Sequence, residues 1–489
     1  MPLKQRSEYK LNDYRRLLKK TPGLLEISER ACTKALSAAD PDLPQAQICV
    51  SMFVLGPTLL AFVSWVLKQA QETGKRRLYF LARDGWLMYR MAQTLCEVQR
   101  LSAKTFSGKT GYEKQYSLEC RYLYASRYAW RLPEQHLIGT GSLERICRGG
   151  MHVTFSDLMR RAGLTEREAK KIARLVQPGR GVDETLSWRE IRRLRAPLAE
   201  CSEFCELADR RSRSRYEAAV GYLTQEGLLE DIPYALVDSG WIGTMQESLG
   251  HLLQSAGYSR PLEGYYFGLY SLPETADRKG YHGWYFEPAS GTGRKTLFSN
   301  CLFECIFTAP HGMTEGYERK GKRWEPILTP AYPEKEKWVR QQMMLLTLYL
   351  ETVADFCSED AESHPGSLSL EAEQVRIPAL LKSFMSAPSR EESACYGNAL
   401  FSDDVTEEKM RPLAECLTQR QFMDHHLVPR LRLMLFPGGR KLHDSGWMEG
   451  SIRLYGGRLY AWHRMGMLLY RYALYTRMRL DFRKRRKAA

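Results

Sequence analysis

The sequence lacks the cysteine and histidine spacings from which zinc sites are built. None of its 12 cysteines is followed by another after two residues, and the closest pairs are Cys201 with Cys205 and Cys301 with Cys305. No histidine completes a ligand set in the usual spacing. We therefore expect buried free thiols rather than a metal site.

Two stretches lack features that would place the chain outside the cytoplasm or in a membrane. Residues 1–20 are mostly polar and charged, without the apolar run of a signal peptide, which predicts a reducing, cytoplasmic compartment. Residues 48–67 carry no charge over about the length that spans a bilayer. Because Gly56-Pro57 divides this stretch and a strand follows closely, we expect a buried pair of helices beneath a sheet.

Acidic residues are scarcer than basic ones. The chain has 57 Asp and Glu against 72 Lys and Arg, a formal charge of +15. This excess favours encounter with phosphates, anionic lipid heads or acidic polymers. With 489 residues, 44% of them hydrophobic, the composition is that of a globular protein with more than one domain and excludes a disordered chain.

Strand and helix patterns alternate along much of the chain. Apolar strands are predicted at 78–82, 122–125, 234–238, 262–270 and 282–286, with helices at 86–98 and 244–255. This alternation predicts an α/β fold with a mainly parallel, Rossmann-like sheet covered on both faces.

Helical patterns flank and interrupt this core. We predict a helical N-terminal appendage over residues 1–45 and an α/β core over 46–330, with a helical insertion at about 133–230. A helical C-terminal region, 331–489, contains a Ser/Glu-rich loop at 358–373 and ends in a basic tail at 483–487.

The insertion holds two predicted helix starts and one motif of nucleic-acid-binding proteins. Thr165 with Glu168 and Ser187 with Glu190 form capping boxes. Residues 155–169 resemble a basic helix-turn-helix. Any two short helices joined in this way produce the pattern, and the basic residues are typical of a solvated face, so nucleic acid is not the partner we expect.

Two segments with the same order of features define the candidate site. Each runs from a buried strand through an Asp and a Gly into a helix, which is an arrangement that binds anions or sugars. A third loop follows the second strand. The candidate catalytic residues are Asp84 and Asp238, and the candidate ligand-binding residues are Arg83, Gly85, Ser126, Arg127, Ser239, Gly240, Trp241, Gly243, Thr244, Gln246, Glu304 and His311.

Each residue type has an expected role. The two aspartates would accept hydroxyl protons or hold a metal, for which Mg²⁺ is the ion we consider, while the sequence itself identifies no cofactor. Arg83 and Arg127 would neutralise phosphate, and the amides near Gly240 with Thr244 would complete its cradle.

Structural roles remain open for the same residues. Both aspartates can cap the helices that follow them, and Arg83 can form an ion pair at the sheet edge. Ser126 with Arg127 can form a turn. The tryptophans at 86 and 241 can serve packing alone, and His311 can be a structural histidine.

The two Asp loops depart from known phosphate chemistries. Phosphatases with an aspartate nucleophile need a second Asp two residues later, where this chain has Trp86 and Gly240. The segment from Leu236 to Thr244 is similar to the type I phosphoribosyltransferase loop, but Ser239 replaces its second acid and the turn is one residue short. The loop nevertheless keeps groups that can bind a ligand: a carboxylate that accepts hydrogen bonds from hydroxyls, and backbone amides that donate to a phosphate.

Six motifs in a fixed order resemble a known region. They are Leu55-Gly56-Pro57, Tyr79 to Gly85, Tyr124 to Arg127, Val237 to Gly243, Gly264 to Leu269, and Phe303 to Gly312. In this order they look like the region, here about residues 50–320, found in predicted haloacid dehalogenase (HAD) superfamily hydrolases of bacterial cell-surface polysaccharide gene clusters.

The resemblance implies a cytoplasmic bacterial protein of polysaccharide biosynthesis. The phosphatase motifs of that family lie in a separate, preceding module, and residues 1–40 contain none of them. We expect a protein that binds or transforms a phosphorylated sugar or nucleotide-sugar, as a hydrolase or transferase. The alternative is a non-catalytic scaffold that recruits glycosyltransferases and other glycan-synthesis enzymes. The two hypotheses differ in whether the predicted residues surround one pocket.

The C-terminal segment combines aromatic and apolar residues with arginines over residues 459–480, before the basic run. Such a helix can lie in the headgroup plane of an anionic membrane, which would place the protein at the inner face of the membrane. Alternatively, its apolar face packs on the core and the tail is solvated.

Overall fold

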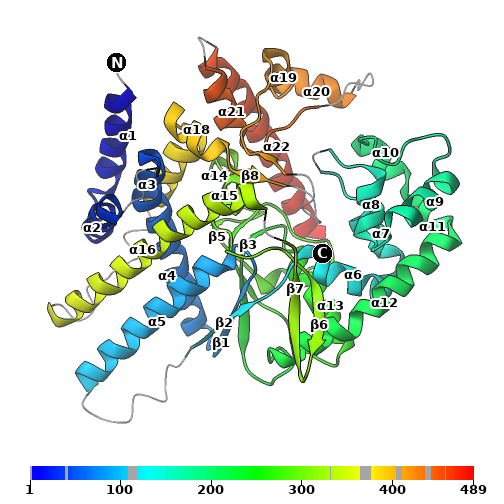
Figure 1. The fold of residues 1–489 in the computed structure, drawn as a ribbon, viewed down its shortest axis with the longest axis horizontal. Coiled ribbons are helices and arrows are strands. Elements are labelled where there is room, and N and C mark those ends of the chain that lie inside the picture. Colours follow the sequence, from blue (N-terminus) through cyan, green and yellow to red (C-terminus); the bar gives the residue numbers. More distant parts are fainter. Residues whose placement is uncertain are drawn as a thin grey trace.

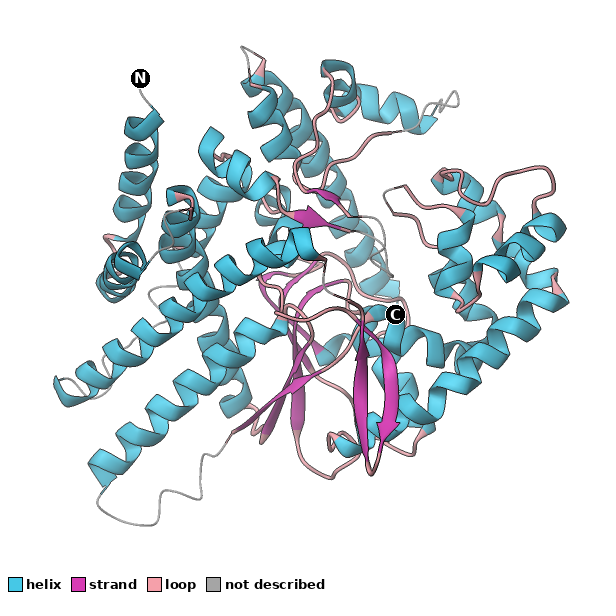
Figure 2. Cartoon of the chain, in the orientation of Figure 1, coloured by secondary structure: helices cyan, strands magenta, loops and turns pink. Residues whose placement is uncertain are grey.

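The computed structural model describes residues 3–38, 42–107, 118–150, 152–330, 332–363, 376–402, 410–435, 442–456 and 459–488. Its central sheet consists of β1 (Arg77–Leu81), β2 (Glu119–Leu123), β3 (Tyr234–Trp241), β4 (Gly264–Leu269) and β5 (Tyr281–Phe286). The strands are all parallel, in the order β2-β1-β3-β4-β5 (Figure 1, Figure 2). The predicted α/β fold with a Rossmann-like sheet is confirmed.

Helices cover both faces of the sheet because alternate strand residues point to opposite sides. In β1, Phe80 joins the core beneath one set of helices and Tyr79 joins the core beneath the other. Burial on both faces explains the unbroken apolar runs of these strands. The first set includes α4 (Gly56–Glu72), α5 (Gly85–Ser107) and α16 (Pro333–Ser363), and the second includes α6 (Arg127–Ile138), α12 (Ser202–Gln225) and α13 (Thr244–Ser255).

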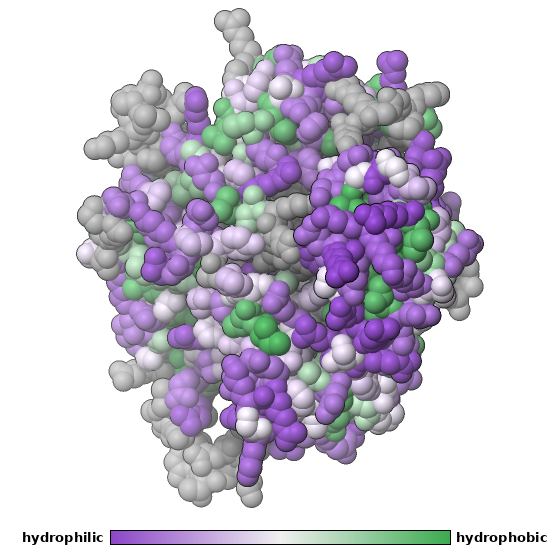
Figure 3. Space-filling view, turned by 45° about the vertical axis from the view of Figure 1, so that its right-hand side comes forward, coloured by the Kyte–Doolittle hydropathy of each residue, from purple (hydrophilic) through white to green (hydrophobic). Residues whose placement is uncertain are grey.

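The helical insertion between β2 and β3 has a small core of its own, which includes Phe155, Leu158 and Ile172. It begins with α6, earlier than predicted, and the two predicted capping boxes at its helix starts are confirmed. The face that turns forward on this side of the molecule is mainly hydrophilic (Figure 3). Between α6 and α12 the insertion contains α7 (Ser142–Ile146), α8 (Phe155–Arg161), α9 (Glu166–Val176), α10 (Trp188–Arg193) and α11 (Arg195–Glu200).

The uncharged segment forms one continuous helical run, so the expectation of two helices divided at Gly56-Pro57 is wrong. α3 (Gln45–Val50), a π-helical turn (Ser51–Leu55) and α4 follow without interruption. Proline is tolerated here because it falls in the first turn of α4. Glycine is needed because the Tyr349 ring occupies the place of a Cβ.

This run, Gln45–Glu72, is the one helix within the described ranges that is long and apolar enough to cross a membrane. Of the most apolar stretch of 18 residues in this helix, 89% is buried inside the structure, which is consistent with the core helix of a soluble protein.

The N-terminal helices join the core on one face of the sheet. α1 (Leu3–Leu18) and α2 (Pro22–Ala38) add Tyr14 and Ile27 to the core that contains Phe80. α16 continues to Ser363, so the first residues of the predicted Ser/Glu-rich loop are helical, and the rest of that loop lies outside the described residues.

The C-terminal region is helical, as predicted. The basic residues expected to form a tail belong to its last helix, α22. The remaining elements are α14 (Thr292–Thr296), α15 (Asn300–Ile306), the hairpin of β6 (Thr314–Lys320) and β7 (Arg323–Leu328), α17 (Ile377–Leu381), α18 (Arg390–Gly397), β8 (Leu400–Phe401), β9 (Arg411–Pro412), α19 (Gln419–Met423), α20 (Leu427–Leu435), α21 (Met448–Tyr455) and α22 (Tyr460–Ala488).

Candidate functional site

The candidate site lies at the carboxyl edge of the sheet, where the strand order reverses. The helix that follows β1, α5, covers one face, and the helix that follows β3, α13, covers the other. A crevice opens between two such strands, and ligands of parallel α/β sheets bind there. In this protein the crevice contains a cavity of about 380 Å³.

The structure brings most of the predicted site residues together around this cavity, which we call the cationic cavity for the charges described below. Asp84 follows β1 and Asp238 lies within β3, so both aspartates reach the crevice between these strands. The predicted residues that line the cavity are Arg83, Asp84, Ser126, Arg127, Asp238, Ser239, Gly240, Trp241, Thr244 and Glu304.

Four predicted residues do not line the cavity. The amide nitrogen of Gln246 donates to the carbonyl oxygens of Leu262 and Gly280, so this side chain joins the sheet to neighbouring loops. His311 lies in an aromatic cluster, where its Nε2 is 2.7 Å from the hydroxyl oxygen of Tyr122. Neither side chain is positioned to contact a ligand in the cavity.

The two predicted glycines that do not line the cavity, Gly85 and Gly243, allow the backbone to pass close to neighbouring groups. Gly85 is the first residue of α5, and a Cβ there would lie 3.0 Å from the backbone of Phe80. Gly243 precedes α13 with φ 67°, and a Cβ would lie 2.5 Å from the Tyr281 ring. Both glycines let a helix start close to the sheet edge.

Ser126 and Arg127 begin a helix and do not form a turn. Ser126 is the N-cap of α6 and its hydroxyl oxygen accepts a hydrogen bond from the amide of Ala129. Ser126 Oγ also donates to the carbonyl oxygen of Thr314 over 2.5 Å, which joins α6 to the β6–β7 hairpin. Arg127 therefore enters the cavity from a fixed helix N-terminus.

The two aspartates are linked through the chain of β3. Ser239 Oγ donates to Asp84 Oδ2 over 2.5 Å. The carboxylate of Asp238 accepts hydrogen bonds from the backbone amides of Ser239 and Gly240. Asp238 does not cap α13, whose N-cap is Gly243 without a side-chain hydrogen bond.

Burial changes the protonation of both carboxyls. It raises the pKa of Asp238 to about 7, with a further contribution from the negative charge of Glu304 and opposition from the two amides. Burial, followed by the charge of Asp238, likewise raises the pKa of Asp84 above its ordinary value. Proton exchange near neutral pH is therefore available at this site.

The loop after Asp238 has an unusual backbone. Gly240 has φ 102° and Trp241 has φ 70°, a value that residues with a side chain rarely adopt. The indole Nε1 of Trp241 donates to Glu304 over 2.5 Å, which holds this conformation against α15. Strained backbone of this kind concentrates at functional sites.

Further arginines, which were not among the predicted site residues, make the cavity strongly cationic. These arginines come from the helical insertion. The C-terminal region adds three further lining residues, Lys335, Phe401 and Ser402. The cations that line the cavity are Arg83, Arg127, Arg131, Arg145, Arg148, Arg161 and Lys335, and the acids are Asp84, Asp238 and Glu304.

Arg131 is a buried cation with little compensation of its charge. Its side chain is 8% exposed, and its Nε has no hydrogen-bond partner among the described residues. Nη2 donates to Thr244 Oγ1 over 2.7 Å. The carboxylate that acts on it, Glu134, is already paired with Arg145 and His251.

The surroundings of Arg131 oppose its charge. Burial and then the guanidiniums of Arg127, Arg148 and Arg145 hold the pKa of Arg131 well below its ordinary value. Because arginine stays charged in proteins, this shift reflects first the cost of burying the charge and then repulsion, and a bound anion would offset both. The site is therefore suited to a phosphate group.

The residues present do not form a metal site of their own. Within the described part of the chain, no group of three or more His, Cys, Asp or Glu side chains could hold a metal ion.

Comparison with known proteins adds no family to this description. No protein-family model matches the chain, and no curated protein matches it at a significant level. The resemblance to the HAD-associated region stays a prediction.

Proposed function

We propose that this protein binds a phosphorylated sugar or nucleotide-sugar in the cationic cavity and hydrolyses it or transfers part of it. The observation that carries the proposal is Arg131, a buried guanidinium with an unsatisfied Nε at the carboxyl edge of a parallel sheet. An anionic group in the cavity supplies the missing acceptor and counter-charge.

The part of the ligand next to its phosphate would meet groups that exchange hydrogen bonds with hydroxyls. The carboxyl of Asp238, which can exchange hydrogen bonds with hydroxyls, lines the same cavity as the arginines. A phosphate on the arginines would therefore place its neighbouring sugar carbon beside the aspartates. This arrangement supports a ligand that carries both groups.

Acid–base chemistry is the proposed role of Asp84 and Asp238. Near neutral pH one carboxyl can hold a proton while the other is ionised, since both pKa values are raised. The ionised group would take a proton from an attacking hydroxyl or water, and the protonated one would donate to the leaving oxygen. The arginines would stabilise charge on the phosphate as the bond breaks.

The resemblance supplies the biological setting of the proposal. It implies a cytoplasmic bacterial protein of cell-surface polysaccharide biosynthesis, for which glycosyltransferases are the proposed partners. The scaffold hypothesis predicts no shared pocket. The arrangement of Asp84, Ser126, Arg127 and Asp238 around one cavity supports the ligand-binding hypothesis over it.

A peripheral contact with anionic membranes is a separate part of the proposal. α22 packs on the protein through Tyr475, whose ring lies 5.2 Å from that of Tyr270, and through the ion pair of Arg471 with Glu449. Its other side exposes a stripe of apolar residues. They are Trp462, Met465, Leu469, Tyr472 and Leu480.

A thermal-shift screen of hexose 1-phosphates and nucleoside diphosphate sugars tests the proposed ligand. A ligand at a hundred times its dissociation constant adds about 2.7 kcal/mol to the free energy of unfolding. The shift should disappear in Arg131→Met and persist in Arg16→Met, on the exposed side of α1. No shift with any compound, or equal shifts in both variants, would overturn the proposal.

A further inference from the structure

A second cavity adjoins the cationic cavity on the side of the helical insertion. It has a volume of about 550 Å³, within the range of roughly 300–1,000 Å³ typical of ligand pockets. Met313 lines both cavities. Its lining residues are Tyr128, Ser156, Arg160, Leu164, Thr165, Glu166, Ala169, Asp183, Met313 and Glu315.

The same helices build the two cavities. In α6, Arg127 lines the cationic cavity and its neighbour Tyr128 lines the second one. In α8, Arg161 lines the cationic cavity and Arg160 the second one. Met313 lines both cavities, and neighbouring residues of α6 and α8 line one cavity each. The two cavities are therefore neighbouring compartments of one cleft.

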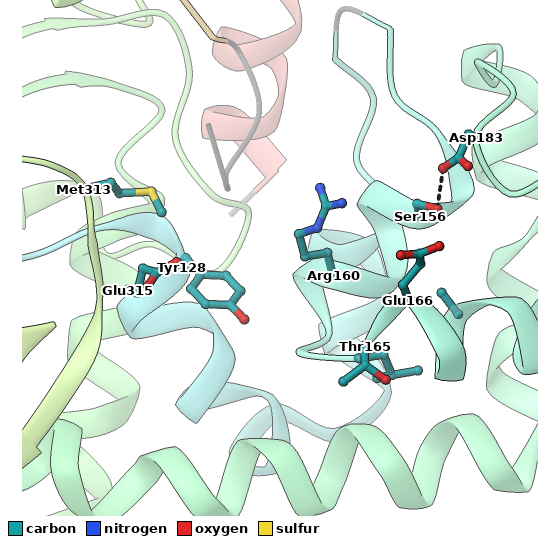
Figure 4. Close-up of a pocket in the computed structure, with 10 residues that line it drawn as sticks. Tyr128, Ser156, Arg160, Thr165, Glu166, Asp183, Met313 and Glu315 are labelled. Atoms are coloured by element: carbon teal, nitrogen blue, oxygen red, sulfur yellow. Dashed lines mark hydrogen bonds between the residues drawn. The ribbon is translucent and has the colours of Figure 1, made fainter. Parts of the chain in front are cut away.

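Among the charged residues that line the second cavity, acids outnumber cations. Three acids and one arginine line it, so we call it the acidic compartment. In Figure 4, the Tyr128 ring and the Arg160 side chain approach from opposite sides. Ser156 Oγ donates to Asp183 over 2.7 Å, which leaves the second oxygen of that carboxylate for a ligand (Figure 4).

We propose that the acidic compartment binds the uncharged, polyhydroxylated part of the ligand whose phosphate occupies the cationic cavity. This inference rests on the proposed function and identifies where the sugar lies. Carboxylates accept hydrogen bonds from sugar hydroxyls, and an aromatic ring packs on the apolar face of a sugar.

Tyr128 and Glu315 are the groups expected to contact the sugar. Both line the compartment, and the charges of Arg215 and then Glu315 act on the Tyr128 hydroxyl. Burial raises the pKa of Tyr128, so its hydroxyl stays protonated and can donate to a sugar oxygen. Glu315 lies on β6, which Ser126 ties to the N-terminus of α6.

Calorimetric titration with inorganic phosphate and with a panel of hexose 1-phosphates tests the assignment. In the unmodified protein, one hexose 1-phosphate should bind more tightly than phosphate. Glu315→Gln and Tyr128→Leu should each weaken that compound about tenfold and change phosphate binding less than twofold. The matched control is Glu318→Gln, on the same strand, where the side chain pairs with Lys320 at 3.1 Å.

The outcomes separate this inference from the proposed function. If phosphate binds but no hexose 1-phosphate binds more tightly, the acidic compartment is not a sugar site and the inference is overturned. Equal losses for phosphate and sugar phosphate in Glu315→Gln would overturn it as well. If neither phosphate nor any sugar phosphate binds the unmodified protein, the phosphate site itself is rejected.

Discussion

The hydroxyl of Ser239 donates to the carboxylate of Asp84 over 2.5 Å and so joins the loop after β1 to strand β3. Both residues sit where the strand order reverses. The contact holds one carboxyl in place, while the backbone amides of β3 hold Asp238. The crevice therefore holds two carboxyls fixed by hydrogen bonds beside an excess of arginines. This differs from a sheet edge at which aspartates only cap helices.

Replacement of Asp238 should stabilise the protein at alkaline pH. The folded carboxyl has a pKa of about 7, above the unfolded value of about 3.9, so the native state binds more protons between these values. The free energy of unfolding therefore falls as pH rises through this window, and the cost is complete above pH 7. Asp238→Asn removes this cost and should raise the free energy of unfolding by about 2–4 kcal/mol at pH 8.

Urea denaturation at pH 5 and pH 8 measures this gain. Asp481→Asn, at the exposed end of α22, is the control and should change little at either pH. A gain for Asp238→Asn that is no larger at pH 8 than at pH 5 would contradict a buried carboxyl that holds its proton.

Arg131 and Arg77 are both buried arginines and should respond in opposite ways to the same substitution. Arg77 is 4% exposed and pairs with Glu119 at 2.5 Å and Glu230 at 2.9 Å. Arg77→Met should cost about 2 kcal/mol or more, since paired and hydrogen-bonded charges are lost. Arg131→Met should leave the free energy of unfolding unchanged or higher and should weaken the binding of phosphate at least tenfold. Denaturation and calorimetry measure both effects, and a large loss of stability in Arg131→Met would show a structural ion pair.

The pH should also control anion binding. As pH rises through about 7, Asp238 ionises and adds negative charge beside the arginines. The affinity for sulfate, whose own charge is constant over this range, should therefore fall between pH 6 and pH 8. In Asp238→Asn the fall should be much smaller. An equal pH dependence in both proteins would exclude Asp238 as its source.

Two glycine substitutions test the backbone of the site loop. Gly240 has φ 102°, and a Cβ would lie 2.7 Å from the carbonyl oxygen of Gly268, so Gly240→Ala should cost about 2 kcal/mol or more. Gly74 has φ 66° with nothing within 4 Å of a Cβ, so Gly74→Ala should cost about 1 kcal/mol. Thermal denaturation compares them, and equal costs would mean that the close approach to Gly268 relaxes freely.

Membrane contact through α22 should depend on its exposed apolar stripe. Met465→Glu with Leu469→Glu should abolish co-sedimentation with anionic vesicles at low salt, because burial of these side chains and attraction of the arginines act together. Leu36→Glu, an exposed leucine on α2, is the matched control. If the intact protein does not sediment with vesicles, or the double variant sediments as well as the control, the membrane proposal is wrong.

The sequence alone determined the five strands of the central sheet, the helices that follow β1 and β3, and the two aspartates near strand ends, because these depend on local patterns. A buried strand such as β1 shows as an apolar run; Asp84 comes soon after such a run, and Asp238 directly follows the apolar residues of β3. Since the carboxyl ends of parallel strands share one edge, the convergence of the two aspartates was predictable.

The tertiary structure decided which other side chains surround these aspartates. Arg131 and Arg161 come from an insertion whose local pattern shows only short basic helices, and Lys335 comes from the C-terminal region. His311 follows an apolar run, yet it packs on Tyr122 instead of entering the cavity. Such contacts join residues far apart in the chain, and the packing of whole elements determines them, so the local pattern does not contain them.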